Sequence, residues 1–266
     1  MNALPRISII TPVFNRVEML EQTILSVLGQ NYPNLEYIII DGGSTDGTVD
    51  IIRKYADQLT YWVSEQDNGM YDAIMKGMAH ATGEIVTWLN SDDLYHTGAL
   101  HIVGQIFAQL PDVQWLTGTP TLYNAEGICV KTFPVQHWSW QRFQRGDFRW
   151  IQQESTFFRR SLFEQVGGLN LTYRLAADFE LWCKMFQFAN LYSVNTVLGG
   201  FRQHGNQLSI NQNMQYENEV KKICTAFSIR YTESKYRKWL KRLPCKKHYN
   251  LVEYNFDLHL WQPRVK

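Results

Sequence analysis

The sequence predicts an α/β fold, a doubly wound and mostly parallel sheet of Rossmann-like type with a C-terminal helical extension. Short apolar runs at 7–10, 36–40 and 61–63 are each followed by apolar residues at helical spacing, so three strand–helix units lie within the first hundred residues. Polar residues follow each run, and the carboxyl ends of parallel strands meet at one edge of a sheet. Beyond about residue 215 the composition becomes basic and aromatic, which predicts the helical extension.

The composition is that of a chain able to bury a large core. It has 266 residues, of which 45% are hydrophobic and 19% charged. A net charge of +1 argues against a general nucleic-acid-binding protein. No leader pattern opens the chain and no window approaches ~18 uninterrupted apolar residues, so we expect neither a signal peptide nor a membrane span. The cysteines lie far apart without metal-binding spacing, which predicts reduced thiols in the cytoplasm: Cys129, Cys183, Cys224 and Cys245.

The first predicted strand, 7–10, is closed by Thr11 and Pro12. Proline has no N–H to donate, so Pro12 is expected to end the ladder of hydrogen bonds. Thr11, Phe14 and Asn15 are then left at the carboxyl edge of the strand. Apolar residues at helical spacing predict a helix over 17–28.

The second predicted strand, 36–40, runs into a loop at 41–48 that reads Asp-Gly-Gly-Ser-Thr-Asp-Gly-Thr. Glycines let the backbone approach a ligand closely. The spacing matches neither common phosphate-binding loop, and acids stand where those loops present bare amides. Because carboxylates suit donor groups such as the N–H of a base or a sugar hydroxyl, the loop predicts a nucleotide that is read by its base.

A third predicted strand, 61–63, leads through a polar loop into a helix over 71–81. Asp72 and Lys76 lie one turn apart on that helix. They form either a modest surface ion pair or two side chains that face the nucleotide.

The strand at 84–89 is followed directly by Asn90-Ser91-Asp92-Asp93. Adjacent carboxylates form a hard-oxygen site that suits Mg²⁺ or Mn²⁺ and the phosphates these ions carry. The alternative is a polar turn that caps the next helix. The other polar loops at the same edge favour the ligand site.

The second half of the chain contains a stretch, 138–150, in which aromatic residues alternate with arginines. It predicts either an acceptor platform, because sugar rings stack on aromatic side chains, or an aromatic mini-core under a loop. Around it we expect a helix at 100–110, a strand at 113–118, a hairpin over 121–132, a strand at 155–158 and helices at 160–168 and 176–188. Asp178 opens the last helix, a position usual for a helix cap.

Five motifs in this order resemble family 2 glycosyltransferases, and the resemblance covers about residues 6–205. It implies a GT-A fold, a nucleotide-sugar donor that is most often UDP-linked, a Mn²⁺ or Mg²⁺ cofactor and inversion at the anomeric carbon. The motifs are Thr11-Pro12-Val13-Phe14-Asn15, the 41–48 loop, Asp67-Asn68-Gly69-Met70-Tyr71-Asp72-Ala73, Asn90-Ser91-Asp92-Asp93 and Asp178-Phe179-Glu180-Leu181-Trp182.

Carried over position by position, the resemblance implies a role for each matching residue. Asp178 would be the catalytic base, while Asp93 and His204 would bind the metal. Thr11 and Asp41 would lie in the base pocket, Asp92 would hold the ribose and Arg202 would lie near the diphosphate. The implied nucleotide-sugar-binding set is Thr11, Pro12, Phe14, Asn15, Asp41, Gly43, Asp67, Asp72, Lys76, Asn90, Ser91, Asp92 and Arg202. The implied acceptor residues are Trp150, Gln153, Glu154 and Trp182.

The sequence departs from the family pattern at two positions. Gly42 stands where many members carry a second acid that commonly reads uracil, and Asn90 replaces the first acid of the usual Asp-x-Asp. The Gln-x-x-Arg-Trp signature of processive synthases is not found, so we expect one sugar per encounter. A nucleotidyltransferase is the less favoured alternative because the loop at 11–15 lacks a Gly-rich, basic sequence, and a non-catalytic nucleotide-sugar-binding protein would not need Asp178.

We expect a glycosyltransferase domain at 1–212, divided into a nucleotide-sugar half, 1–118, and an acceptor half, 119–212. The basic, aromatic segment 213–266 is expected to be a helical extension. Bacterial relatives of this kind commonly extend saccharide or lipid-linked saccharide acceptors in the synthesis of cell-surface polysaccharides. Lysines and arginines between Lys221 and Lys247 therefore predict either a solvated helical face or a peripheral contact with the inner face of the membrane.

Overall fold

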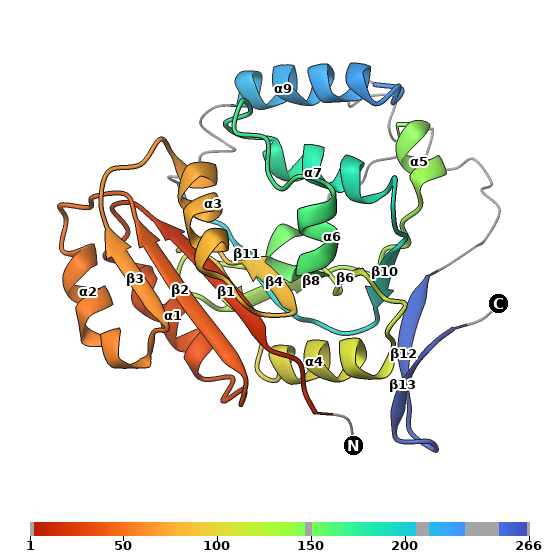
Figure 1. The fold of residues 1–266 in the computed structure, drawn as a ribbon, viewed down its shortest axis with the longest axis horizontal. Helices are drawn as coiled ribbons and strands as arrows, with labels where there is room; N and C mark the ends of the chain where they lie inside the picture. The colour runs from red at the N-terminus through yellow and green to blue at the C-terminus, as the bar shows by residue number, and fades with distance from the viewer. Residues whose placement is uncertain (1–2, 147–150, 206–212, 232–249, 265–266) are drawn as a thin grey trace.

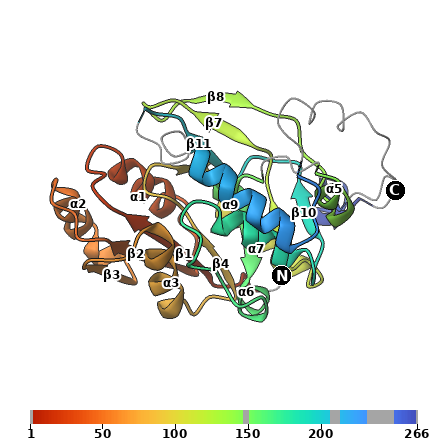
Figure 2. The same cartoon turned by 90° about the horizontal axis from the view of Figure 1, so that it is seen from above.

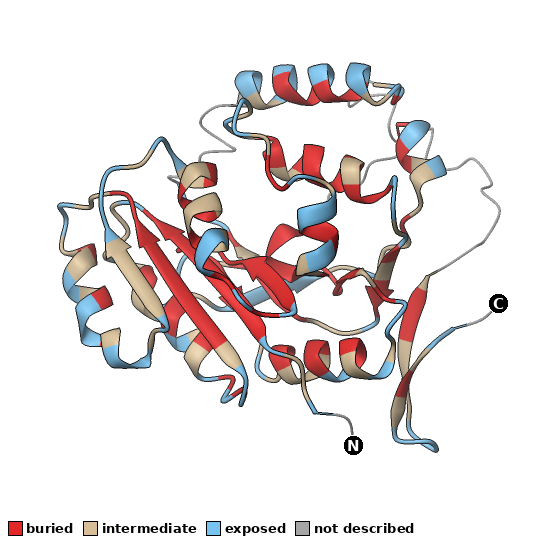
Figure 3. Cartoon of the chain, viewed as in Figure 1, coloured by how far each residue is buried: buried red, intermediate tan, exposed pale blue. Residues whose placement is uncertain are grey.

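The computed structural model describes residues 3–146, 151–205, 213–231 and 250–264. A nine-stranded sheet with the strand order β13-β12-β10-β6-β9-β4-β1-β2-β3 runs through the molecule, and a four-stranded sheet, β5-β11-β7-β8, packs beside it (Figure 1). The strands at the centre of the large sheet are buried (Figure 3). This is the predicted α/β architecture with helices on both faces.

The first half of the chain forms one parallel unit in which β1 pairs with both β2 and β4, and β2 pairs with β3. Its elements are β1 (Ile7–Val13), α1 (Leu20–Leu28), β2 (Leu35–Asp41), α2 (Thr48–Lys54), the 3-10 turn η1 (Ala56–Gln58), β3 (Tyr61–Ser64), α3 (Met70–His80) and β4 (Ile85–Trp88). Every side chain of β1 is buried, as expected of a strand covered on both faces.

Each face of the sheet has its own apolar cluster. Helices α1, α2 and α4 cover one face, where Ile9 of β1 meets Ile24 of α1. Helices α3, α6 and α7 cover the other, where Ile10 meets Ile74 of α3. Contact on that side is close, because a Cβ added at Gly77 of α3 would lie 2.4 Å from the side chain of Ile10. Glycine at position 77 therefore lets α3 lie directly on β1.

Pro12 does not end the first strand, contrary to the prediction. Strand β1 continues to Val13, with Pro12 opposite Ile40 of β2. On its other side β1 pairs with β4 only as far as Ile10. Pro12 thus has a strand neighbour on one side alone, where a missing N–H is tolerated.

The second half of the chain adds antiparallel strands to the large sheet. Strand β9 lies between β4 and β6 and runs antiparallel to both, and β13 at the edge runs antiparallel to β12, so the sheet is mostly and not wholly parallel. The predicted hairpin is confirmed as the antiparallel pair β7 and β8. The elements are β5 (Leu94–Tyr95), α4 (Ala99–Gln109), β6 (Trp115–Thr117), β7 (Thr121–Tyr123), β8 (Cys129–Thr132), α5 (Trp140–Gln144), η2 (Gln153–Ser155), β9 (Thr156–Arg159), α6 (Arg160–Gln165), α7 (Ala177–Met185), β10 (Leu191–Val194) and β11 (Gly199–Arg202).

In the described part of the C-terminal extension, a helix is followed by a β-hairpin. Helix α9 (Asn213–Ala226) crosses over α7 (Figure 2), and its Ile223 joins the same apolar cluster as Leu181 of α7. Strands β12 (Leu251–Asn255) and β13 (Leu260–Pro263) then form a hairpin that extends the large sheet beside β10. Helix α9 and the hairpin β12–β13 therefore both pack onto the domain. Within the described ranges no helix is long and apolar enough to cross a membrane.

Candidate active site

Asp41, at the carboxyl end of β2, organises the loop that follows it. Its buried carboxylate accepts the backbone N–H groups of Gly43 at 3.1 Å and Ser44 at 2.9 Å. It also accepts the hydroxyl of Ser64, at the end of β3, at 2.6 Å. Gly43 has a φ of +86°, a conformation that glycine adopts without strain. Asp41 thus holds the conformation of the loop, and its carboxylate oxygens are hydrogen-bonded within the protein.

Asn15 joins the loop after β1 to the loop after β2. It adopts a left-handed φ of 50°, donates its backbone N–H to Ser44 Oγ at 2.7 Å and accepts the N–H of Thr45 on Oδ1 at 3.0 Å. Thr11 supports this edge from within the sheet, because it is fully buried and its hydroxyl lies 3.1 Å from that of Tyr37. Phe14, by contrast, is 58% exposed at the rim.

Asp67 occupies the space next to Gly42. A Cβ added at Gly42 would lie 2.6 Å from Asp67 Oδ2, so a side chain at position 42 would displace the Asp67 carboxylate from its present position. Asp67 Oδ1 accepts the N–H of Gly69 at 2.8 Å, and within the described part of the chain Oδ2 has no hydrogen bond. The Asp67 carboxylate therefore occupies the space that a side chain at position 42 would need, and it comes from the loop after β3.

Asp72 and Lys76 hold the loop before α3. Asp72 Oδ2 accepts the N–H of Asn68 at 2.9 Å and lies 3.8 Å from Lys76 Nζ. Lys76 also pairs with Glu65 at 3.0 Å. These contacts shape the loop that carries Asp67, and they match the ion-pair interpretation of Asp72 and Lys76.

The turn after β4 separates two adjacent carboxylates. Asp93 is 1% exposed, and its oxygens accept the N–H of Arg202 at 2.9 Å and the side-chain amide of Asn90 at 3.2 Å. Thr23 of α1 fixes the backbone of the turn by donating its hydroxyl to the carbonyl groups of Ser91 and Asp93. Burial, followed by the charges of Glu154 and Asp92, raises the pKa of Asp93 well above its usual range. The amide of Asn90 gives Asp93 a hydrogen bond that an ionised carboxylate at position 90 could not donate.

Asp92 instead faces the loops. Its Oδ2 lies 3.0 Å from His204 Nε2 and 3.8 Å from Arg16 Nε. The resemblance implied that Asp93 and His204 both bind the metal. In the structure His204 lies beside Asp92, while Asp93 accepts the backbone N–H of Arg202, two residues before His204. Arg16 was not among the predicted site residues, although it directly follows the motif after the first strand.

The Asp92–His204 pair has the chemistry of a partial divalent-metal site. Among the described residues no group of three or more His, Cys, Asp and Glu side chains is arranged to hold a metal. Mg²⁺, however, is commonly bound by one or two carboxylates together with substrate phosphates and water. One carboxylate and one imidazole therefore fit a cation that arrives with a diphosphate.

Asp178 lies in the first turn of α7 and is partly buried. Its Oδ1 accepts the hydroxyl of Tyr71 at 3.2 Å and the N–H of Phe179 at 2.8 Å. Burial raises the pKa of Asp178 from 3.8 to about 6. A carboxylate of that basicity is suited to general-base catalysis near neutral pH. Tyr71, which holds it, belongs to α3, and its spacing from Asp178 gave no signal in the sequence.

Glu154 lies between the two groups of acids. It is 3% exposed, and its pKa is raised to about 8 by burial, then by the charges of Asp178 and Asp92. Its neighbour Gln153 donates to the carbonyl oxygen of Trp88, at the end of β4, at 2.6 Å. Glu154 is thus a buried acid whose pKa is raised by carboxylates from both parts of the site.

The predicted acceptor aromatics are not exposed in the described residues. Trp182 is 2% exposed and stacks between Trp88 and Trp115, with ring centroids at 6.0 and 5.7 Å. It belongs to the core, because it lies on the face of α7 that covers the sheet. Trp138 and Phe143 are also buried, as the mini-core alternative requires. Trp150 lies outside the described residues.

Comparison with known proteins identifies relatives of this sequence. The family model described as glycosyl transferase family 2 matches residues 8–167. An uncharacterized glycosyltransferase of Mycobacterium tuberculosis is 30% identical over 211 residues, which cover 77% of this chain and 78% of the relative.

Solved structures share the fold. A mannosyltransferase from Pyrobaculum calidifontis, in complex with GDP-Man and Mn²⁺, matches 90% of this chain and 69% of its own with a TM-score of 0.64 and 20% identity. TarS residues 1–349 from S. aureus, in complex with UDP-GlcNAc, matches 88% of this chain and 70% of its own with a TM-score of 0.63 and 14% identity. These similarities confirm the predicted GT-A fold.

Proposed function

We propose that this chain, which belongs to glycosyl transferase family 2, transfers one sugar from a UDP-sugar to a saccharide or lipid-linked saccharide acceptor. The configuration at the anomeric carbon of the sugar is inverted in the reaction. The observation that carries the proposal is the arrangement at Asp178, whose carboxylate accepts the hydroxyl of Tyr71 at 3.2 Å at the start of α7 and has its pKa raised to about 6 by burial. On the donor side, Asp92 lies 3.0 Å from His204.

The donor-binding groups are proposed from their exposure and partners. Asp67 replaces the missing acid at position 42 and reads the base, since one carboxylate oxygen suits the single imide N–H of uracil. Asp92 and His204 would hold Mn²⁺ or Mg²⁺, which supplies charge neutralisation at the departing diphosphate. Arg16, which lies 3.8 Å from Asp92, adds positive charge at the same place.

Asp178 is proposed as the base. It takes the proton of the acceptor hydroxyl, whose oxygen then bonds to the anomeric carbon while the bond from that carbon to the diphosphate oxygen breaks. The bonding electrons leave with UDP, and attack from the opposite face inverts the configuration. The hydroxyl of Tyr71 orients the Asp178 carboxylate for this proton transfer.

The proposed location is the cytoplasmic face of the membrane, where a lipid-linked acceptor would lie. The basic stretch between Lys221 and Lys247 lies largely outside the described residues, and the exposed Phe256 and Leu258 project from the turn between β12 and β13. Basic residues near an anionic leaflet contribute about 1 kcal/mol each, which supports peripheral attachment at the cytoplasmic face. Sedimentation with anionic vesicles at low salt, lost at high salt and with neutral vesicles, is the expected result. Equal sedimentation with both lipids rules out this attachment.

The central experiment measures UDP binding by calorimetry with and without Mn²⁺, together with release of UDP from UDP-sugars. We expect tighter UDP binding with Mn²⁺ and slow UDP release even when water is the only acceptor. Tight UDP binding without any turnover on a panel of UDP-sugars and saccharides would indicate a non-catalytic nucleotide-sugar-binding protein. Lack of UDP binding would overturn the proposed donor.

A further inference from the structure

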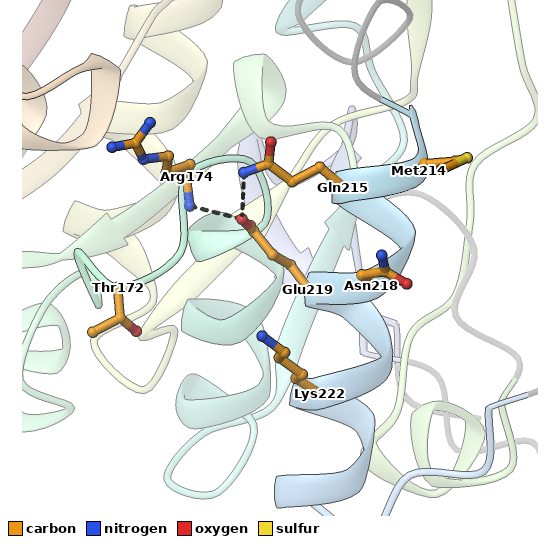
Figure 4. A pocket seen from close by; sticks show the side chains of 7 residues that line it. All are labelled: Thr172, Arg174, Met214, Gln215, Asn218, Glu219 and Lys222. Carbon is orange, nitrogen blue, oxygen red and sulfur yellow. Dashed lines mark hydrogen bonds between the residues drawn. The ribbon is translucent and has the colours of Figure 1, made fainter.

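Glu219 of α9 binds the backbone that leads into the helix of the proposed base. It is 8% exposed, and its carboxylate accepts three consecutive backbone N–H groups. These belong to Arg174 at 3.1 Å, Leu175 at 2.9 Å and Ala176 at 3.0 Å. Gln215, one turn earlier on α9, donates to the same carboxylate at 3.3 Å (Figure 4). Glu219 thus takes four hydrogen bonds, three of them from one short segment.

These three residues are the last before α7, which begins at Ala177. Ala176 is the N-cap and has no side-chain oxygen, so its own side chain cannot cap α7. Within the first turn, Asp178 accepts the N–H of Phe179 at 2.8 Å. Glu219 adds an acceptor from a distant element, which binds the N–H of Ala176 two residues before Asp178. A carboxylate at this end of a helix also interacts favourably with the helix dipole.

The carboxylate lies beside open space. Between the segment before α7 and α9 there is a cavity of about 600 Å³ (Figure 4). Its lining residues are Thr172, Arg174, Met214, Gln215, Asn218, Glu219 and Lys222. The cavity gives a side chain of similar size at position 219 room to relax. A substitution there therefore tests the hydrogen bonds without overpacking the core.

We infer that Glu219 is a positioning residue for the proposed base, an inference that rests on the proposed function. It acts on Asp178 in two ways. Its hydrogen bonds fix the start of α7, and its negative charge contributes to the raised pKa of Asp178. Among the described residues, the other ionisable groups that interact with Asp178 are Tyr71 from α3 and Glu154 from η2. The C-terminal extension, which lies beyond the family match at 8–167, is thereby part of the catalytic machinery.

The test compares the variants Glu219→Gln and Glu219→Ala with a control, Glu217→Gln. Glu217 carries an exposed carboxylate on the same helix. Each full-length variant is assayed for UDP affinity with Mn²⁺ and for UDP release from a UDP-sugar as a function of pH. We expect kcat to fall about tenfold in Glu219→Gln and about a hundredfold in Glu219→Ala, the scale of loss when a supporting partner is removed. UDP affinity is expected to stay within twofold, and Glu217→Gln to behave as wild type.

The pH profile separates positioning from general stability. Removing the charge of Glu219 lowers the pKa of Asp178, so the acid limb of the kcat profile in Glu219→Gln is expected at lower pH than in wild type. If the acid limb of the pH profile and kcat are both unchanged in Glu219→Gln, Glu219 is not a positioning residue for Asp178. A loss of kcat that the folded fraction, measured by circular dichroism, accounts for in full also overturns the inference. Failure of wild type to bind UDP would instead count against the proposed function, so the two failures are distinguishable.

Discussion

The donor-side loops and the helix that carries Asp178 are held in place by different kinds of contact. After β1 and β2, the loops bind each other directly, and the hydrogen bond from Thr45 to Asn15 spans 30 residues of sequence. Asp178 is held by Tyr71, 107 residues away. The segment before it is held by Glu219, 43 residues beyond Ala176. The loops after β1 and β2 form a local network. Asp178 is placed by separate elements of the fold, as is the Asp92–His204 pair, whose residues lie 112 positions apart.

This difference has consequences for how the two sides respond to mutation. A local network of side-chain and backbone hydrogen bonds keeps its geometry when a distant element shifts. The base side depends on the packing of α3, α7 and α9 against one another. Changes on the base side should therefore lower turnover and spare UDP binding, while changes on the donor side should lower UDP binding first.

The largest effect is expected from Asp178→Asn, which removes the proposed base. Turnover should fall by about 10²–10⁴, the range typical of general-base catalysis. UDP affinity should stay near that of wild type, because Asp178 belongs to the base side. In wild type, kcat should fall as the pH drops below about 6, since protonated Asp178 accepts no proton. Retention of most activity by Asp178→Asn would move the base to another residue, with Glu154 and Glu180 the next candidates.

The second prediction contrasts the adjacent carboxylates Asp92 and Asp93. Asp92→Ala should lose about a hundredfold of its Mn²⁺-dependent UDP affinity, measured by calorimetry, and keep its fold, because Asp92 faces His204. Asp93→Ala should lower the free energy of unfolding by about 1–3 kcal/mol, since it leaves the N–H of Arg202 buried without its acceptor. The reverse pattern would return the metal to Asp93, as the resemblance implied.

Motifs contiguous in sequence were the predictable part of the fold and of the site. Apolar runs followed by polar residues located β1, β2 and β4 to within a few residues, and the loops after β1 and β2 do meet at one edge. The exposure of individual residues was not predictable. Thr11 and Trp182 belong to elements covered on more than one side, so residue type does not say which way they face.

Two further features lacked a readable signal. Residues Tyr71 and Glu219 act across more than forty positions, and no local pattern links either of them to Asp178. The hairpin β12–β13 was hidden by its basic surroundings, although Val252 and Tyr254 alternate toward the cluster that includes Trp261. Here tertiary packing outweighed the composition on which the helical prediction rested.

The third prediction sharpens the donor side by moving one carboxylate. Asp67→Ala removes the proposed base contact, and Gly42→Asp forces a side chain against Asp67 Oδ2 at 2.6 Å. Each single variant should bind UDP about tenfold more weakly, the value of roughly one hydrogen bond to a charged group. The double variant should recover most of that loss, because it places the acid at position 42 and frees the space that Asp67 occupied. If the losses of binding free energy in the two single variants simply add in the double variant, Asp67 does not replace that acid. Asp67→Asn, which keeps the size and loses the charge, is the matched control.

The smallest effect concerns Glu154, the residue shared by both sides. Its pKa is raised from 4.5 to about 8, so between these values the folded chain holds a proton that the unfolded chain has released. Its contribution to stability is therefore fully present at pH 4.5 and is lost as the pH rises through about 8. Glutamine at position 154 stays neutral throughout this range.

Glu154→Gln should accordingly raise the melting temperature at pH 8.5 by several degrees relative to wild type, and change it little at pH 5. Thermal unfolding over this pH range measures the difference, with the exposed Glu217→Gln as control. Parallel curves for wild type and Glu154→Gln would mean that the carboxyl group stays ionised in the fold. The same variant also tests whether the two sides act separately. If UDP affinity and kcat both change at pH 7, Glu154 couples the donor network to the base; if neither changes, the acids on its two sides are placed independently, and its proton serves stability alone.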